Sequence, residues 1–100
     1  MQLKIVTVTE QQLDYARQVF SELRDVGWRV ELDERNEKLG YKIREAQLAR
    51  IPYAIVIGDS EVQARTVAPR RRGGENLTPM RLNEFMERLK SEVAQERGEA

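Results

Sequence analysis

Two clusters of residues with binding chemistry flank an apolar segment in the middle of the chain. The first cluster is the run of residues 33–46, which combines cations, an amide and a tyrosine around the predicted start of a helix. The second cluster is the triplet Arg70, Arg71 and Arg72. A guanidinium group binds phosphates and base edges well, because its planar fork donates two hydrogen bonds at once. The two clusters therefore indicate a surface for an anionic partner.

Three further side chains could add selectivity to this attraction. Asn36 offers both donors and acceptors, which reading a base edge requires. Tyr41 could stack on an unpaired base, or it could lie at the boundary of the hydrophobic core. Glu61 is the unusual member, since a carboxylate beside an anion is costly unless it accepts hydrogen bonds, for example from the donor edge of guanine or the amino group of cytosine. Because A-form duplexes hide base edges, this combination favours single-stranded RNA.

The distribution of charge supports the same surface. The chain is neutral, with 17 cations and 17 anions. Residues 35–72 nevertheless carry nine cations and four anions, whereas residues 1–34 carry four and seven, and residues 73–100 carry four and six. A basic middle block between two acidic blocks is a candidate contact surface. The alternative is a set of solvated faces with no partner, and charge alone does not decide between the two.

The composition gives little support for an enzyme. The chain has no histidine and no cysteine, so the commonest general base and thiolate chemistry are both absent. It also has no glycine-rich phosphate loop and no serine in a nucleophile elbow. Asp59 and Glu61 could be paired carboxylates, but a turn acid and a solvated acid are the favoured interpretation. We expect no catalytic residue, no metal and no cofactor.

The length and hydropathy suggest one soluble globular domain. One hundred residues can build one core, and we expect a single domain over residues 1–96 with a frayed tail at residues 97–100. No apolar run approaches ~20 residues, so no membrane partner is expected. The absence of cysteine fits a cytoplasmic location.

The apolar periodicity predicts alternating strands and helices. Strands are expected at residues 3–8, 28–33, 53–57 and 62–69, the last at a sheet edge because it contains Pro69. A first helix is expected between a capping box at Thr9 and Gln12 and a terminating glycine at Gly27. A second helix is expected at residues 37–50 with Asn36 as its cap, and a third from Thr78-Pro79 onward. Right-handed crossovers would place these helices around a mainly parallel sheet that antiparallel strands complete.

Several spaced motifs resemble one known family. The motifs are Asp33-x-Arg35-Asn36-Glu37-Lys38-Leu39-Gly40-Tyr41-Lys42-Ile43-Arg44-Glu45, then Ile51-Pro52-Tyr53, Gly58-Asp59-x-Glu61-Val62 and Val67-Ala68-x-Arg70-x-Arg72-Gly73. Together they resemble the C-terminal anticodon-binding domain of class II aminoacyl-tRNA synthetases, and the likeness is closest to the threonyl-tRNA synthetases. The prolyl, histidyl and glycyl versions share parts of the pattern. The resemblance implies a three-layer α/β/α domain with a mixed five-stranded sheet and three helices.

The resemblance also implies roles for individual residues. Asn36 matches an asparagine that reads an anticodon base, Glu61 a glutamate that accepts hydrogen bonds from the guanine of the threonine anticodon, and Arg70 an arginine in the same region. Lys38 and Arg44 match basic positions near the RNA. The sequence departs from the family at Ser60, where lysine is frequent, and at Pro69, which could shift the strand that carries Arg70. The full candidate set for RNA binding is Asn36, Lys38, Glu61, Arg70, Arg35, Lys42, Arg44 and Arg72.

The expected function is thus a tRNA-binding module that reads the anticodon loop of threonine tRNA. It would not aminoacylate alone, since the resemblance assigns catalysis to another domain of an ATP-dependent threonine–tRNA ligase. The chain could be an excised domain, a free-standing paralogue or an engineered derivative. The alternative is a protein-interaction or accessory domain with the same fold and no tRNA recognition.

Overall fold

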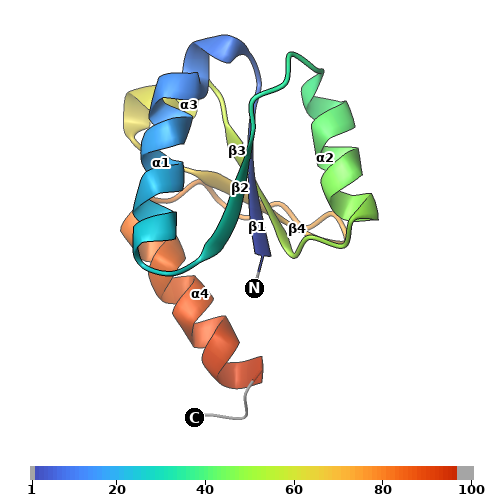
Figure 1. Ribbon diagram of the computed structural model, residues 1–100. Coiled ribbons are helices and arrows are strands. Elements are labelled where there is room, and N and C mark those ends of the chain that lie inside the picture. The colour runs from blue at the N-terminus through green and yellow to red at the C-terminus, as the bar shows by residue number, and fades with distance from the viewer. Residues whose placement is uncertain (1, 97–100) are drawn as a thin grey trace.

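Strands and helices alternate along the chain up to the third strand. The structure, a computed structural model, describes residues 2–96 (Figure 1). The expected tail at residues 97–100 lies outside the described residues. The elements are β1 (Gln2–Thr7), η1 (Glu10–Gln12), α1 (Leu13–Asp25), β2 (Arg29–Asp33), α2 (Leu39–Leu48), β3 (Tyr53–Ile57), α3 (Asp59–Ala64), β4 (Ala68–Arg71) and α4 (Leu82–Glu96).

The sheet is mixed. Its four named strands lie in the order β2-β1-β3-β4, with β1 parallel to β2 and β3, and with β4 antiparallel to β3. Residues 75–80 form a fifth, irregular strand along β4, joined by bridges from Val67 to Met80 and from Arg70 to Asn76. The mixed five-stranded sheet expected from the resemblance is confirmed.

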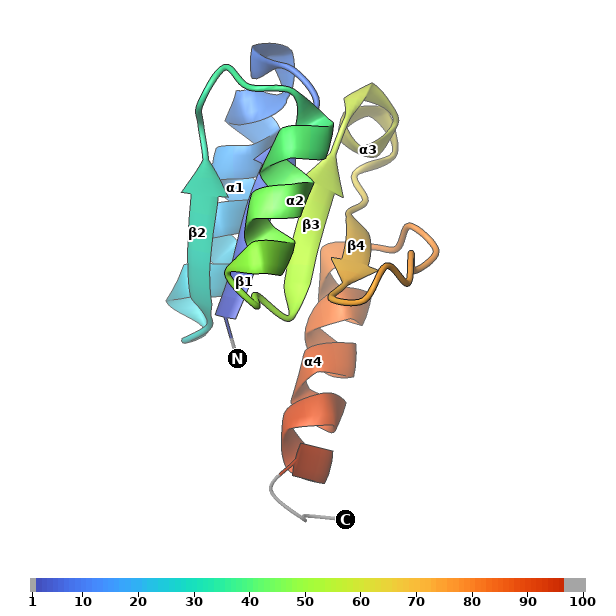
Figure 2. The same cartoon turned by 90° about the vertical axis from the view of Figure 1, so that its right-hand side faces the viewer.

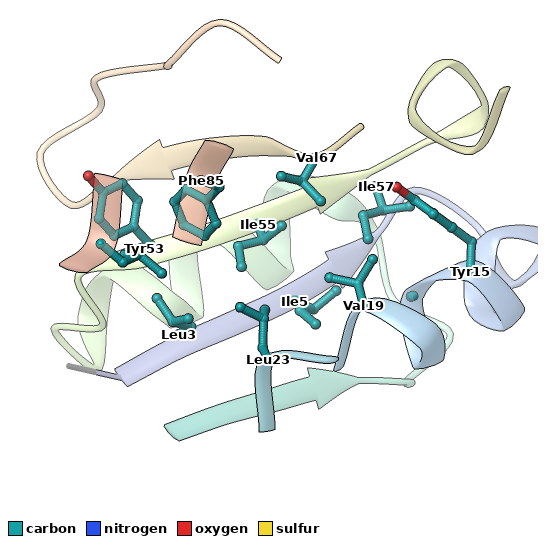
Figure 3. Close-up of a cluster of buried hydrophobic side chains, with 12 residues drawn as sticks. Leu3, Ile5, Tyr15, Val19, Leu23, Tyr53, Ile55, Ile57, Val67 and Phe85 are labelled. Atoms are coloured by element: carbon teal, nitrogen blue, oxygen red, sulfur yellow. The ribbon is translucent and has the colours of Figure 1, made fainter. Parts of the chain in front are cut away.

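Helices cover both faces of this sheet. Helices α1 and α4 lie on one face and α2 lies on the other (Figures 1 and 2). The larger core lies under α1 and α4, where the inward residues of β1 and β3 meet buried side chains such as Leu23 and Phe85 (Figure 3). A smaller cluster of Val6, Ile43 and Val56 lies under α2. The alternation of side chains along β1 and β3 therefore fills both layers, and the three-layer α/β/α architecture is confirmed.

The predicted signals around the first helix are both present. The amide of Thr9 donates to Gln12 Oε1 at 2.7 Å, and the Gln11 amide donates to Thr9 Oγ1 at 3.2 Å. Gly27 ends the helical segment with a φ of +98°, and the amide of Trp28 donates back to the carbonyl of Leu23 at 3.1 Å. This is the Schellman arrangement, whose left-handed residue favours glycine.

The strand expected at residues 62–69 was wrong in its first half. Residues 59–64 form α3 instead, because the Glu61 carboxylate accepts a hydrogen bond from the Gly58 amide at 2.8 Å and thereby caps a short helix. The strand β4 begins only at Ala68. Pro69 does not displace it: Leu77 donates to the Pro69 carbonyl at 3.0 Å, so the backbone of Pro69 faces residues 75–80 and costs no bond to β3.

Two expected helix starts were also wrong. Helix α2 begins at Leu39 with Lys38 as its N-cap residue and without a side-chain cap, so Asn36 does not cap it. Helix α4 begins at Leu82 rather than at Thr78-Pro79. The reason is that the amide of Met80 donates to the Val67 carbonyl at 3.0 Å, which keeps residues 78–80 extended beside β4.

Candidate nucleic-acid interface

The candidate reading residues lie along one edge of the sheet, where the parallel strands end. Asn36 lies in the loop that follows β2, and Glu61 lies in α3 directly after β3. Strand β1 lies between β2 and β3, and neighbouring strands are about 4.8 Å apart, so these two segments leave the sheet about 10 Å apart. Figure 2 shows the β2–α2 loop and α3 at the same end of the sheet. We call this end the reading edge.

Asn36 presents an unused amide at the reading edge. Its side chain is exposed, and within residues 2–96 it forms no hydrogen bond. Lys38, two residues on, is also exposed at the N-terminus of α2, whose backbone amides are electropositive. A ligand at this point would meet free donors, one free acceptor and positive charge.

Glu61 is held in place by the turn that it caps. Its Oε1 accepts from the Gly58 amide, while its Oε2 has no hydrogen-bond partner among residues 2–96. A Cβ at Gly58 would lie 3.1 Å from Val8 Cγ2 and 3.3 Å from Glu61 Oε1. Glycine therefore allows Glu61 to approach the backbone closely, and the second oxygen remains available for a donor of a ligand.

A layer of buried polar side chains lies beneath the reading edge. Its members, Thr7, Gln12, Asp33 and Lys42, are the buried polar or charged residues among those that the structure describes. Lys42 Nζ donates to the Thr7 carbonyl at 3.2 Å, and Gln12 Nε2 donates to Asp59 Oδ1 at 2.7 Å. The first bond joins the end of β1 to α2, and the second joins η1 to the start of α3.

The burial of Lys42 corrects the sequence-based expectation. Lys42 was expected to be an exposed cation that attracts phosphates, but only 2% of the residue is exposed. It lies beside Ile43 on the face of α2 that packs against the sheet, so its long side chain reaches the end of β1 rather than solvent. Its role is to hold α2 and β1 together.

Arg35 is bound to two carboxylates rather than left free for a ligand. Its guanidinium contacts Asp33 Oδ2 at 2.8 Å, and it also contacts Glu45 of α2. Hydrogen bonds from Arg35 hold the pKa of Asp33 below its usual range and lower the pKa of Glu45 as well. The ring of Tyr41, which is exposed and not part of the core, lies 5.7 Å from the guanidinium carbon.

The three consecutive arginines point to different surfaces, as alternation along a strand requires. Arg70 pairs with Ala54, which packs against Ala46 on the α2 face of the sheet. Arg71 turns to the opposite face, where it lies over Tyr53 and contacts Glu92 of α4 at 3.5 Å. Arg72 is exposed in the turn after β4. Its amide donates to the Pro52 carbonyl at 2.9 Å, so Arg72 lies near the start of β3, at the opposite end of this strand from Gly58. The structure therefore does not bring Arg72 to the reading edge.

Arg44 is exposed on α2. Helical spacing places it on the side of α2 away from the buried residues Ile43 and Ala46, which face the sheet. Arg44 therefore lies on the solvent side of α2.

Other kinds of site are not supported by the residues that the structure describes. Within residues 2–96, no three acidic side chains come together in a way that could hold a metal ion. None of the helices in this range is both long and apolar enough to span a membrane. A groove of about 690 Å³ lies between α1, α3 and α4, and none of the candidate RNA-binding residues lines it.

Residues 2–92 match the anticodon binding domain family. The chain belongs to this family. Among curated proteins, it is 53% identical over 93 residues to a threonine–tRNA ligase of Citrifermentans bemidjiense and 50% identical over 95 residues to that of Lawsonia intracellularis. These alignments cover 93% and 95% of this chain but only 15% of each relative. The chain thus spans about 15% of the length of the curated relatives that it matches.

Solved structures agree with the sequence comparison. The RNA binding domain of threonyl-tRNA synthetase from Cryptosporidium parvum superposes on 90% of this chain with a TM-score of 0.86 and 28% identity, and the match covers 23% of that chain. A prolyl-tRNA synthetase of the same organism superposes with a TM-score of 0.82 on 95% of this chain and 21% of its own. At 19% identity the second match shows the fold alone.

Two features of this anticodon-binding domain were missed from the sequence. The first is the ion-pair group formed by Arg35, Asp33 and Glu45, because the partners lie on different elements and nothing in the local pattern joins them. The second is the capping of α3 by Glu61. A glycine followed three residues later by glutamate is a weak capping signal that could have predicted it.

Proposed function

We propose that this anticodon-binding domain binds the anticodon loop of tRNA, threonine tRNA in particular, as one part of a threonine–tRNA ligase. The observation that carries the proposal is the reading edge, where the unused amide of Asn36 and the unused Oε2 of Glu61 lie at the same end of the sheet in a chain about half identical to threonine–tRNA ligases. Aminoacylation would belong to the catalytic domain of that ligase, which is the domain's second partner in the cytoplasm.

Attraction for the RNA backbone and selectivity for bases would come from different residues. Lys38, Arg44 and Arg70 are cations without an ion pair among residues 2–96, and they would meet phosphates. The Glu61 carboxylate would accept from N1–H and the 2-amino group of guanine, which a splayed loop leaves open. Since Asn36 and Glu61 arise about 10 Å apart, they would read two different bases rather than one.

A titration with an altered base tests the reading role of Glu61. The probes are a threonine anticodon stem–loop and the same stem–loop with inosine, which lacks the 2-amino group, in place of the anticodon guanine. We expect the unaltered domain to prefer guanine by about 10-fold or more, the value of one charge-assisted hydrogen bond. The variant Glu61→Gln should lose most of this preference while its amide oxygen still accepts from Gly58 and keeps α3 folded.

The variant Asn36→Ala provides the comparison within the reading edge. It should weaken binding of the guanine and inosine stem–loops by the same factor, because Asn36 would read another base. Equal guanine preference in Glu61→Gln and the unaltered domain would contradict the assignment of Glu61. An unaltered domain that binds no stem–loop would contradict the proposed function itself and favour a protein-interaction role.

A further inference from the structure

The geometry points to a positioning role for Arg35: together with Asp33 and Glu45 it forms a clamp that holds residues 34–38 in the conformation that presents Asn36. We call these three residues the Arg35 clamp. The inference rests on the proposed function, because it concerns how Asn36 is presented to RNA. It replaces the expectation that Arg35 itself attracts phosphates.

The clamp holds the start of the loop through both the backbone and the side chain of Arg35. The Arg35 amide donates to Asp33 Oδ1 at 3.1 Å, and Arg35 Nε donates to the same oxygen at 3.0 Å. Asp33 is the last residue of β2, and its side chain is 2% exposed and lies 4.0 Å from Lys4 of β1. One buried carboxylate therefore holds the residue that immediately precedes Asn36.

The clamp also connects the start of the loop to the helix that follows it. The Arg35 guanidinium donates a hydrogen bond to Glu45, which lies in the second half of α2, and its central carbon lies over the Tyr41 ring. Residues 34–38 thus connect two anchored points, the end of β2 and helix α2. A loop anchored at both ends has less conformational entropy to lose when a base binds, which raises affinity without a new contact.

Charge argues against direct phosphate contact by Arg35. The two carboxylates already occupy the guanidinium, and Lys4 beside Asp33 makes the group neutral, so a phosphate gains little by approaching Arg35. The two roles consequently predict opposite results when Glu45 is removed. If Arg35 contacts phosphate, the loss of Glu45 frees the cation and strengthens RNA binding. If Arg35 positions the loop, the loss of Glu45 weakens binding although a negative charge has been removed.

The test compares Glu45→Ala with Glu37→Ala in titrations with the threonine anticodon stem–loop. Glu37 lies in the same loop and forms no ion pair with residues 2–96, so its removal makes the same change in charge without touching the clamp. We expect Glu45→Ala to weaken binding by about 3- to 10-fold, the cost of ordering one or two side chains on binding, and Glu37→Ala not to weaken it. Binding by Glu45→Ala that equals or exceeds that of the unaltered domain would overturn the inference.

The salt dependence of Arg35→Ala separates positioning from contact. A lost phosphate contact makes the log–log slope of affinity against salt shallower by about 0.7, whereas a lost positioning residue leaves the slope unchanged while affinity falls. A shallower slope would overturn the inference. Thermal unfolding of Arg35→Ala and Glu45→Ala checks that each variant is folded at the temperature of the titration.

A measurement without RNA keeps this inference separate from the proposed function. Relaxation of the Asn36 backbone amide by NMR should show greater motion on the ps–ns timescale in Glu45→Ala than in the unaltered domain and in Glu37→Ala. Equal motion of the Asn36 amide in all three proteins would overturn the inference even if the domain binds tRNA. If the unaltered domain binds no stem–loop, the proposed function fails, and the relaxation data alone decide whether the clamp exists.

Discussion

The cations of the basic middle block have several distinct roles that their shared charge conceals. Lys42 is buried against the end of β1, Arg35 is bound by two carboxylates, and Arg71 contacts Glu92. Lys38, Arg44 and Arg70 lie near the reading edge or the α2 face without ion pairs among residues 2–96. About three phosphate contacts at ~0.7 each correspond to a salt slope of about −2. Under the proposed function the attraction for RNA would therefore be modest, and selectivity would depend on Asn36 and Glu61.

Asp33 gives the clamp a signature in the pH dependence of stability. Because hydrogen bonds from Arg35 lower its pKa in the folded state, Asp33 stabilises the fold fully above its unfolded pKa of about 3.9, and this contribution is lost as the pH falls through the folded pKa. We expect Asp33→Asn to lower the free energy of unfolding by about 1.5–3 kcal/mol at neutral pH, the value of a hydrogen bond to a charged group.

Urea unfolding of both proteins between about pH 7 and pH 2 checks this prediction. The difference in the free energy of unfolding between the unaltered domain and Asp33→Asn should stay constant down to about pH 4 and then shrink at lower pH. Parallel curves over the whole range would show that the Asp33 carboxylate contributes nothing as a charge.

At the scale of elements, the ends of helices place the functional loops. The Schellman turn at Gly27 returns the chain from α1 to β2, and the uncapped start of α2 leaves its amides open at the reading edge. Glu61 caps the short helix α3, so the same carboxylate stabilises its own helix and, in the proposed function, would accept from the ligand. Loss of this residue would alter structure and recognition together, which is why glutamine is the informative substitution.

Two glycines, one just after α1 and one in the first turn of α2, should change the stability of the domain in opposite directions when replaced by alanine. Gly27 has a φ of +98°, so Gly27→Ala forces a left-handed alanine and should destabilise the domain by about 1 kcal/mol. Gly40 lies in the first turn of α2 with no atom within 4 Å of an added Cβ, so Gly40→Ala should stabilise it by about 0.5 kcal/mol. Chemical unfolding measures both, and destabilisation by Gly40→Ala would contradict the described geometry of α2.

At the scale of the whole molecule, the two faces of the sheet have different character. The α1–α4 face holds the larger core and the ion pairs of Arg71, whereas the α2 face and the reading edge hold Lys38, Arg70 and the candidate reading residues. The neutral net charge therefore hides a molecule in which one face and one edge are suited to an anionic strand.

The order of elements and the core could largely be predicted, because they depend on local patterns. The buried strand Tyr53–Ile57 is apolar throughout, and the capping box at Thr9 and the turn at Gly27 are strong local signals. The missing information was tertiary. A short apolar run such as residues 62–69 does not distinguish helix from strand. A lysine such as Lys42 is expected to be exposed unless the packing of its helix is known. The hydrogen bonds between Val67 and Met80, which keep residues 78–80 extended and move the start of α4 to Leu82, join residues far apart in the sequence.

The candidate site was predicted in part, and its reading residues stay predictions. The sequence pointed to Asn36 and Glu61 through residue type and resemblance, and the structure places both at one edge. It could not show that Arg35 is bound by Asp33 and Glu45, since that pairing depends on the packing of α2 beside β2. Nor could it show that three adjacent arginines would diverge, because that depends on where β4 begins.

Shift mapping by NMR with a threonine anticodon stem–loop tests the central claim most directly, and a proline stem–loop provides the comparison. We predict that the threonine stem–loop shifts the amides of residues 34–38 and 58–61 and of Arg70, and that the proline stem–loop shifts the same face more weakly. Shifts centred on the groove between α1, α3 and α4, or on the turn at Arg72, would contradict the assignment of the reading edge.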